Sequence, residues 1–133
     1  MLHGVGTDIL HFSRMGALPE DDAFVRRCFT EKERAEIFAR DDPQRCLCTR
    51  FAGKEAVFKA LKMPPDAARL DEIEILSDEN GAPCVTLLGS MARFAEGAGV
   101  VRVQLSLSWE TEYAVAFAVS EGADAPAEKE TGV

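Results

Sequence analysis

The segment between two proline positions in the middle of the chain most constrains the fold. Two aspartates precede Pro43, and a proline in this setting is typical of the first turn of a helix. The next prolines are Pro64 and Pro65, which lack the N–H group that a helix interior needs. The sequence therefore predicts a long central helix over residues 43–61.

A capping box predicts a second helix just before the long one. Thr30 stands at the N-cap and Glu33 three residues later, so each side chain can bond a free backbone N–H at the start of the helix. This helix is expected to end near Ala39. Residues 12–28 also have a helical pattern, which a glycine and a proline interrupt.

Strand patterns dominate the rest of the chain. Apolar side chains recur between other residues over 2–10, which predicts a strand ending at Asp8. Asn80-Gly81 is a strong signal for a hairpin turn. The other expected elements are strands at 70–76, 83–88, 101–108 and 113–119 and a helix at 90–98. Together they predict an α+β fold, a single domain over residues 1–120 with helices packed on one face of an antiparallel sheet. The acidic tail, residues 121–133, is expected to be disordered because it has little apolar surface to bury.

The composition indicates a globular protein and excludes several classes of function. The chain has 133 residues, 47% of them hydrophobic, which fits one domain. Its net charge of −8 disfavours nucleic acid and anionic membranes as partners. No apolar run approaches the roughly 20 residues that span a bilayer, and the N-terminus lacks a signal-peptide pattern. We therefore expect a cytoplasmic protein whose four cysteines are reduced thiols rather than zinc ligands.

Two segments carry side chains suited to catalysis. Asp8 follows two glycines at the expected end of the first strand. Glu55 and Lys59 lie four residues apart in the long helix, hence on one face, and two phenylalanines flank that face. Spacing alone favours an ordinary helical ion pair, worth about a few tenths of a kcal/mol.

Together, the two segments resemble the motifs of a known family. The pattern G-x-D, followed some 45 residues later by F-x-x-K-E-x-x-x-K, resembles that of the 4'-phosphopantetheinyl transferases. It is most similar to their short, single-domain holo-acyl-carrier-protein synthase type. Three further stretches fit that type: RRCFTEKE at 26–33, NGAP at 80–83 and LSLS at 105–108. The resemblance covers residues 2–120.

The resemblance implies a magnesium-dependent transferase that moves the 4'-phosphopantetheine group of coenzyme A onto a serine of an apo acyl carrier protein, in fatty acid biosynthesis. Asp8 and Glu55 match the family's metal ligands, and a hard cation held by carboxylates suits a reaction at a diphosphate. Lys59 matches the lysine at the transferring phosphate, so all three are expected to be catalytic. Arg50 and Arg45 are expected to hold the phosphates of coenzyme A.

The resemblance also implies contacts with other molecules. The turn at Gly81 and Pro83 is similar to the edge that borders the adenine. Enzymes of this type are similar in being homotrimers, with each coenzyme A between two subunits. The candidates for docking the acidic carrier protein are Arg14, Arg26 and Arg27.

One position departs from the family pattern. Trp109 stands where the family has a histidine, and an indole donates one hydrogen bond but cannot accept a proton at neutral pH. It is counted here with the coenzyme A-binding residues, although an aromatic cap on the edge of the sheet is an equal alternative. Two other functions therefore stay open: a degenerate family member that binds coenzyme A without transfer, and a metal-free acidic interaction module.

Overall fold

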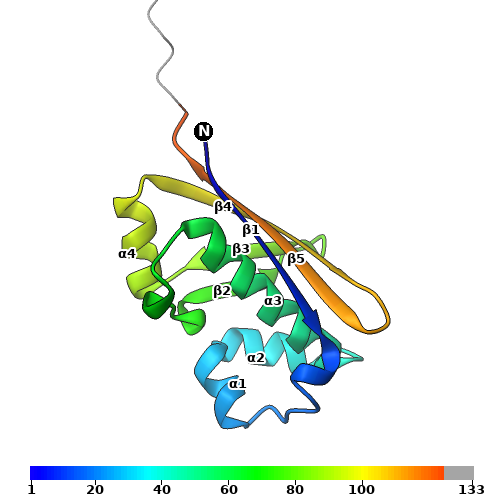
Figure 1. Ribbon diagram of the computed structural model, residues 1–133. Coiled ribbons are helices and arrows are strands. Elements are labelled where there is room, and N and C mark those ends of the chain that lie inside the picture. The colour runs from blue at the N-terminus through cyan, green and yellow to red at the C-terminus, as the bar shows by residue number, and fades with distance from the viewer. Residues whose placement is uncertain (125–133) are drawn as a thin grey trace, which may run out of the picture.

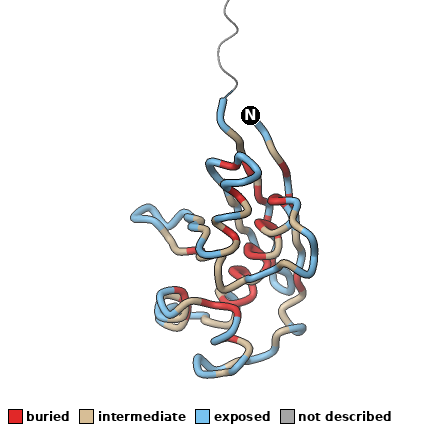
Figure 2. Tube along the Cα trace, turned by 90° about the vertical axis from the view of Figure 1, so that its left-hand side faces the viewer, coloured by how far each residue is buried: buried red, intermediate tan, exposed pale blue. Residues whose placement is uncertain are grey.

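The predicted long helix, α3 (Pro43–Leu61), lies at the centre of the molecule (Figure 1). The computed structural model describes residues 1–124. Asp42 caps the helix by accepting a hydrogen bond from the backbone N of Arg45, and Lys62 ends it in the left-handed conformation. Most of its residues from Leu47 onward are buried, so α3 forms the middle of the core (Figure 2).

A three-stranded antiparallel sheet packs on α3. Its order is β1 (Leu2–His11), β5 (Tyr113–Gly122), β4 (Val100–Trp109), so β1 and β4 are the two edges. The central strand presents three buried alanines to the helix, Ala114, Ala116 and Ala118, and these small residues let α3 lie close. The alternate residues of β5, Val115 and Phe117, are exposed on the opposite face of the sheet.

A separate two-stranded sheet consists of β2 (Ile73–Ser77) and β3 (Pro83–Leu87). Gly81 has a φ of 84° in the predicted hairpin turn, a conformation that favours glycine. The α+β class with antiparallel strands and packed helices is confirmed. The single sheet that we expected is wrong, because β3 lies beside β4 without pairing to it.

The remaining helices lie at the two ends of α3. Helices α1 (Ala23–Cys28) and α2 (Glu31–Phe38) surround a second apolar cluster, and α4 (Gly89–Gly97) follows β3. The capping box is confirmed: the Thr30 hydroxyl accepts from the Glu33 backbone N at 3.2 Å, and a Glu33 carboxylate oxygen accepts from the Thr30 backbone N at 2.9 Å.

Several predicted boundaries differ from the structure. The first strand does not end at Asp8, because Ile9 to His11 continue to pair with β5. Strand β5 runs through Gly122, so the first two residues of the expected tail belong to the sheet; residues 125–133 lie outside the described part. The expected strand at 70–76 begins as a short 3₁₀ turn, η3 (Leu70–Glu72), before β2, and another such turn, η2 (Pro65–Ala67), precedes it. A similar turn, η1 (Phe12–Arg14), opens the interrupted helical stretch. No helix within residues 1–124 is long and apolar enough to cross a membrane.

Candidate functional site

Two glycines bring β1 into backbone contact with α3. A Cβ atom on Gly6 would lie 2.0 Å from the carbonyl oxygen of Ala56, and one on Gly4 would lie 2.3 Å from that of Ala60. Neither distance is possible for a real side chain, so any other residue would push the helix away from the strand. The glycines therefore set the distance between Asp8, on the same side of β1, and the side chains of α3.

The three predicted catalytic residues meet at this contact. Lys59 Nζ lies 3.3 Å from Asp8 Oδ1 and donates to the carbonyl oxygen of Thr7 at 2.9 Å. Burial is the main cause that raises the pKa of the half-buried Glu55; the charge of Asp8 raises it further, and Lys59 lowers it. Lys59 thus pairs with the strand acid rather than with Glu55, its neighbour on the helix.

Asp8 and Glu55 fit a divalent cation. Two carboxylates that repel each other in a partly buried place gain most from a positive charge between them. Within residues 1–124 no cluster of three metal-ligating side chains occurs, so any cation here would complete its coordination with water and substrate oxygens. This arrangement suits Mg²⁺, which keeps much of its hydration in such sites.

A cavity of about 320 Å³ lies between α3, the β2–β3 hairpin and the end of β4. All five residues predicted to bind coenzyme A line it: Arg45, Arg50, Gly81, Pro83 and Trp109. The other lining residues are Arg40, Asp41, Asp42, Cys46, Thr49, Ser77 and Leu107. The lining therefore combines three guanidinium groups and two carboxylates with apolar side chains.

The arginines of this cavity differ in how freely they could bind an anion. The Arg45 guanidinium carbon lies over the Trp109 ring, 4.9 Å from its centroid. Arg45 Nη1 is 3.9 Å from Asp42 Oδ2, a long ion pair. Arg50 is buried and its guanidinium is paired with Glu36 at 2.7 Å. Arg40 is exposed. The sequence analysis missed Arg40, because a lone arginine just after the end of α2 carries no pattern.

The cavity and the carboxylates lie on different sides of α3. Arg50 and Lys59 are nine residues apart, which at about 100° per residue puts them on opposite sides of the helix. Arg45 precedes Glu55 by ten residues, about 15 Å along the axis. In the sheet, Asp8 belongs to one edge strand and Trp109 to the other. The two halves of the predicted site therefore do not meet within one chain.

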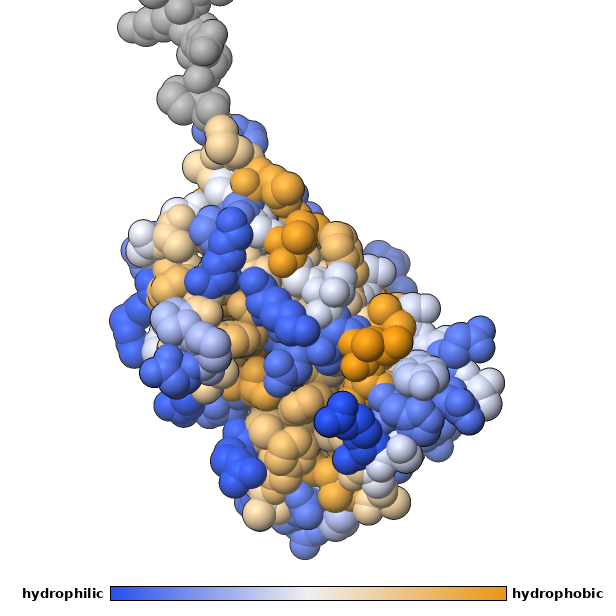
Figure 3. Space-filling model, viewed as in Figure 1, coloured by the Kyte–Doolittle hydropathy of each residue, from blue (hydrophilic) through white to orange (hydrophobic). Residues whose placement is uncertain are grey.

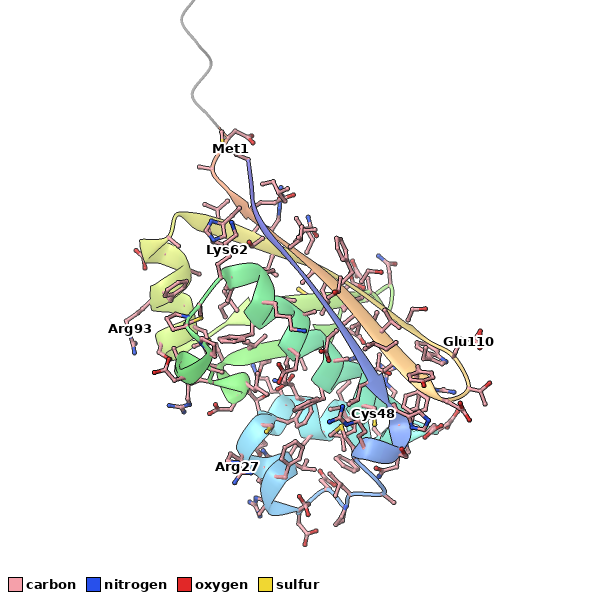
Figure 4. The ribbon with its side chains drawn as sticks, viewed as in Figure 1. Met1, Arg27, Cys48, Lys62, Arg93 and Glu110 are labelled. Carbon is pink, nitrogen blue, oxygen red and sulfur yellow. The ribbon has the colours of Figure 1, made fainter. Side chains whose placement is uncertain are left out.

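The three predicted docking arginines are all exposed, Arg14 in η1 and the other two in the last turn of α1. Figure 4 shows Arg27 beside α1. It also shows Glu110 at the tip of the β4–β5 hairpin. Arg26 shares a surface hollow with the acids Glu20 and Asp21. The third acid of that run, Asp22, caps α1 instead.

Comparison with known proteins identifies the family. Residues 4–118 match the 4'-phosphopantetheinyl transferase superfamily, and the chain belongs to it. A holo-[acyl-carrier-protein] synthase of Desulforudis audaxviator is 40% identical over 124 residues, 92% of this chain and 95% of that protein. The chain is thus of the holo-acyl-carrier-protein synthase type within the superfamily.

Solved structures give the same grouping. The acyl carrier protein synthase of Plasmodium yoelii with ADP bound has a TM-score of 0.82 at 28% identity, over 93% of this chain and 98% of that chain. A complex of the Chronobacterium ammoniagenes enzyme with coenzyme A has a TM-score of 0.76 at 29% identity, over 90% of this chain and 97% of that chain.

Proposed function

We propose that this protein transfers the 4'-phosphopantetheine group of coenzyme A to a serine of an apo acyl carrier protein, with Mg²⁺ as the metal. The observation that carries the proposal is the meeting of Asp8, Glu55 and Lys59 at the contact between β1 and α3. Those three residue types are what phosphoryl transfer needs, because charge must be neutralised as it develops on the phosphate.

In the reaction the serine hydroxyl oxygen attacks the phosphorus attached to pantetheine. A P–O bond forms to serine, the bond to the other phosphate of the diphosphate breaks, and adenosine 3',5'-bisphosphate leaves. Asp8 and Glu55 would hold Mg²⁺, which neutralises charge on the diphosphate. The Lys59 ammonium, half-exposed beside Asp8, can move to an equatorial oxygen of the transferring phosphate. The serine proton goes to a nearby carboxylate or water.

The nucleotide of coenzyme A is proposed to occupy the cavity beside Trp109. Arg40 and Arg45 offer guanidinium groups to its phosphates, and Trp109, Gly81 and Pro83 offer apolar surface to the adenine. The relatives' complexes with coenzyme A and ADP support a nucleotide on this fold.

A homotrimer is proposed to join the two halves of the site. Figure 3 shows apolar side chains along the diagonal that β1 and β5 follow in Figure 1. On the face of the sheet that α3 leaves uncovered, Val5, Ile9, Val115 and Phe117 are exposed by 41–63%. A contiguous apolar sheet face is typical of a protein–protein interface. Association through this face could place the carboxylates of one subunit near the cavity of the next.

The acidic carrier protein is proposed to dock on Arg14, Arg26 and Arg27, and the reaction to serve fatty acid biosynthesis. A cytoplasmic location is also proposed. Its support is that all four cysteines are free, as is usual in a reducing compartment.

One alternative has a specific observation in its favour. Trp109 cannot serve as a base, so a family member that binds coenzyme A without transferring anything is the second candidate. The metal-free interaction module that spacing alone left open has no such support.

The deciding experiment incubates the protein with an apo carrier protein, coenzyme A and Mg²⁺ and weighs the carrier. We expect the carrier to gain the phosphopantetheine mass. Asp8→Asn and Glu55→Gln should each abolish the gain in mass while circular dichroism stays unchanged. Lys59→Ala should lower kcat by on the order of 10²-fold with a smaller change in KM. Coenzyme A binding without any gain in mass would instead support the degenerate binder.

A further inference from the structure

Within residues 1–124 the outer edge of β2 has no partner strand, because the small sheet there consists of β2 and β3. Unpaired strand edges expose backbone groups that need hydrogen-bond partners. Here side chains from two helices supply them. These four side chains, which we name the β2 clamp, are Glu33 and Glu36 of α2 and Arg50 and Lys54 of α3.

The clamp acids bond the backbone N–H groups of the edge. Glu33 Oε2 accepts from the N of Ile75 at 2.9 Å, and Glu36 Oε1 accepts from the N of Ser77 at 3.0 Å. The other oxygen of Glu33 accepts from Thr30 in the capping box, so this carboxylate serves the helix and the strand together.

The clamp bases bond carbonyl groups of the same edge. Lys54 Nζ donates to the carbonyl oxygen of Ile73 at 2.5 Å, and Arg50 Nη1 donates to that of Ile75 at 2.5 Å. Lys54 Nζ also donates to the carbonyl oxygen of Leu70 in η3 at 2.8 Å. Acids and bases therefore alternate along β2 in the places where a neighbouring strand would donate and accept.

Each acid of the clamp is also paired with a base. Lys54 Nζ lies 2.7 Å from Glu33 Oε1 with both side chains fully buried, and Arg50 Nη1 lies 2.7 Å from Glu36 Oε2. Breaking a buried pair leaves an uncompensated charge and is strongly destabilising. The fully buried Glu33–Lys54 pair therefore holds its end of β2 firmly, while the Glu36 side chain at the other end is 24% exposed.

The clamp ends at the cavity. The Ser77 hydroxyl oxygen accepts from Arg50 Nη2 at 2.8 Å and from Arg40 Nη2 at 2.9 Å, and all three residues line the cavity. Glu36 does not line it. A change at Glu36 therefore reaches the cavity through Arg50 and the strand, and otherwise through its charge, which acts on Cys46 in the cavity lining.

We infer that the β2 clamp fixes the β2–β3 hairpin against α3 and thereby sets the nucleotide-binding wall of the cavity. In this arrangement Arg50 is a positioning residue, not the phosphate ligand that the sequence predicts. Lys54 is likewise a positioning residue, at the fully buried end of β2. The nucleotide part of this inference rests on the proposed function; the fixing of the hairpin does not.

The variant Glu36→Gln separates the two roles of Arg50. If Arg50 positions the hairpin, loss of its charge partner should weaken binding of adenosine 3',5'-bisphosphate by about tenfold, which is ~1.4 kcal/mol. If Arg50 is a phosphate ligand held back by Glu36, the same variant should bind the nucleotide as tightly or more tightly, because a competing carboxylate is gone. Trp109, the single tryptophan, gives a fluorescence readout of binding at the cavity.

Amide hydrogen exchange of Ser77 and Ile75 tests the clamp without any ligand. Both amides should exchange faster in Glu36→Gln, Ser77 more so, and Glu31→Gln on the same helix, with the same change in net charge, should alter neither exchange nor affinity. Unchanged exchange in Glu36→Gln would overturn the clamp, and unchanged or tighter nucleotide binding would overturn the role given to Arg50. If the parent protein binds no nucleotide, the proposed function fails, while the exchange result still decides whether the clamp fixes the hairpin.

Discussion

Trp109 is the residue whose chemistry differs most from that of the family histidine. It lines the cavity and stacks on Arg45. An indole cannot accept a proton at neutral pH, and a bound cation would lower the pKa of its water, so we expect the serine proton to leave through water or a carboxylate rather than through position 109. Trp109→His should change kcat/KM by less than about tenfold, ~1.4 kcal/mol in the barrier. A rise of several hundred-fold in steady-state assays would mean that the base belongs at 109 and that the native chain is an impaired enzyme.

Glu55 is a predicted metal ligand whose ionisation costs stability in the absence of a cation. Its folded pKa is raised above the ordinary value, chiefly by burial and then by Asp8. A carboxyl group of this kind contributes stability below its unfolded pKa and loses that contribution as the pH rises through the folded pKa. Without divalent cations, Glu55→Gln should therefore melt at a higher temperature than the parent at neutral pH.

The same difference should shrink as the pH falls through the raised folded pKa and should be smallest below 4.5, the ordinary pKa of the group, where Glu55 is protonated in both states. Adding Mg²⁺ at neutral pH should raise the melting temperature of the parent but not that of Glu55→Gln. Calorimetric scans across pH, with EDTA or Mg²⁺, measure both effects. An equal response of the two proteins to Mg²⁺ would remove Glu55 from the metal site.

The sequence predicts single residues well where a motif or a helical spacing fixes them. Asp8, Glu55 and Lys59 meet as expected, and the five predicted coenzyme A-binding residues line one cavity. Sequence analysis could not find Arg40 or the pairing of Arg50 with Glu36, because these depend on how α2 packs against α3 and β2.

At the scale of elements, the contact between β1 and α3 decides whether Asp8 and Glu55 lie close enough to share the proposed cation. Gly6→Ala would place a Cβ atom 2.0 Å from the Ala56 carbonyl oxygen, so helix and strand must separate. Overpacking of this kind costs about 1–3 kcal/mol. We expect denaturant unfolding to show that loss and calorimetry to show weaker Mg²⁺ binding, because Asp8 moves away from Glu55.

Gly97→Ala is the matched control for this substitution. Gly97 ends α4 with nothing within 4 Å of an added Cβ, so alanine should be neutral or should stabilise the protein by up to about 1 kcal/mol. Equal effects of the two alanines would show that the close approach of β1 to α3 is not needed.

Element type was easier to predict than element limits. Prolines and a capping box are local signals, and they placed α2 and α3 within a residue or two. Strand ends depend on partners far away in sequence: β5 reaches Gly122 because that residue pairs with Val100, and β1 continues past Asp8 for the same kind of reason. The division into two sheets likewise follows from packing between distant strands and leaves no local pattern.

At the scale of the whole molecule, the arrangement of the sheet supports the proposed oligomer. The carboxylates lie beside one edge strand, the cavity beside the other, and the uncovered face between them is apolar. A closed ring of subunits could bury that face and bring unlike edges together at each interface. Small size would then be no obstacle to a deep site, because two copies would build it.

Mixed oligomers test this arrangement directly. Asp8→Asn removes a carboxylate and Arg45→Glu reverses a charge in the cavity, so each variant alone should be nearly inactive at low coenzyme A concentration. If every site takes its carboxylates from one subunit and its cavity from the next, random mixing of equal amounts leaves about a quarter of the sites with both halves intact. Activity should therefore return to about a quarter of the parent value. Native mass spectrometry confirms that mixed oligomers have formed, and a mixture of either variant with itself, treated identically, is the control. Mixed oligomers that are no more active than the separate variants would show that each chain builds its whole site alone. That result would contradict the inference drawn from the positions of Asp8 and Trp109 on opposite edge strands of the sheet.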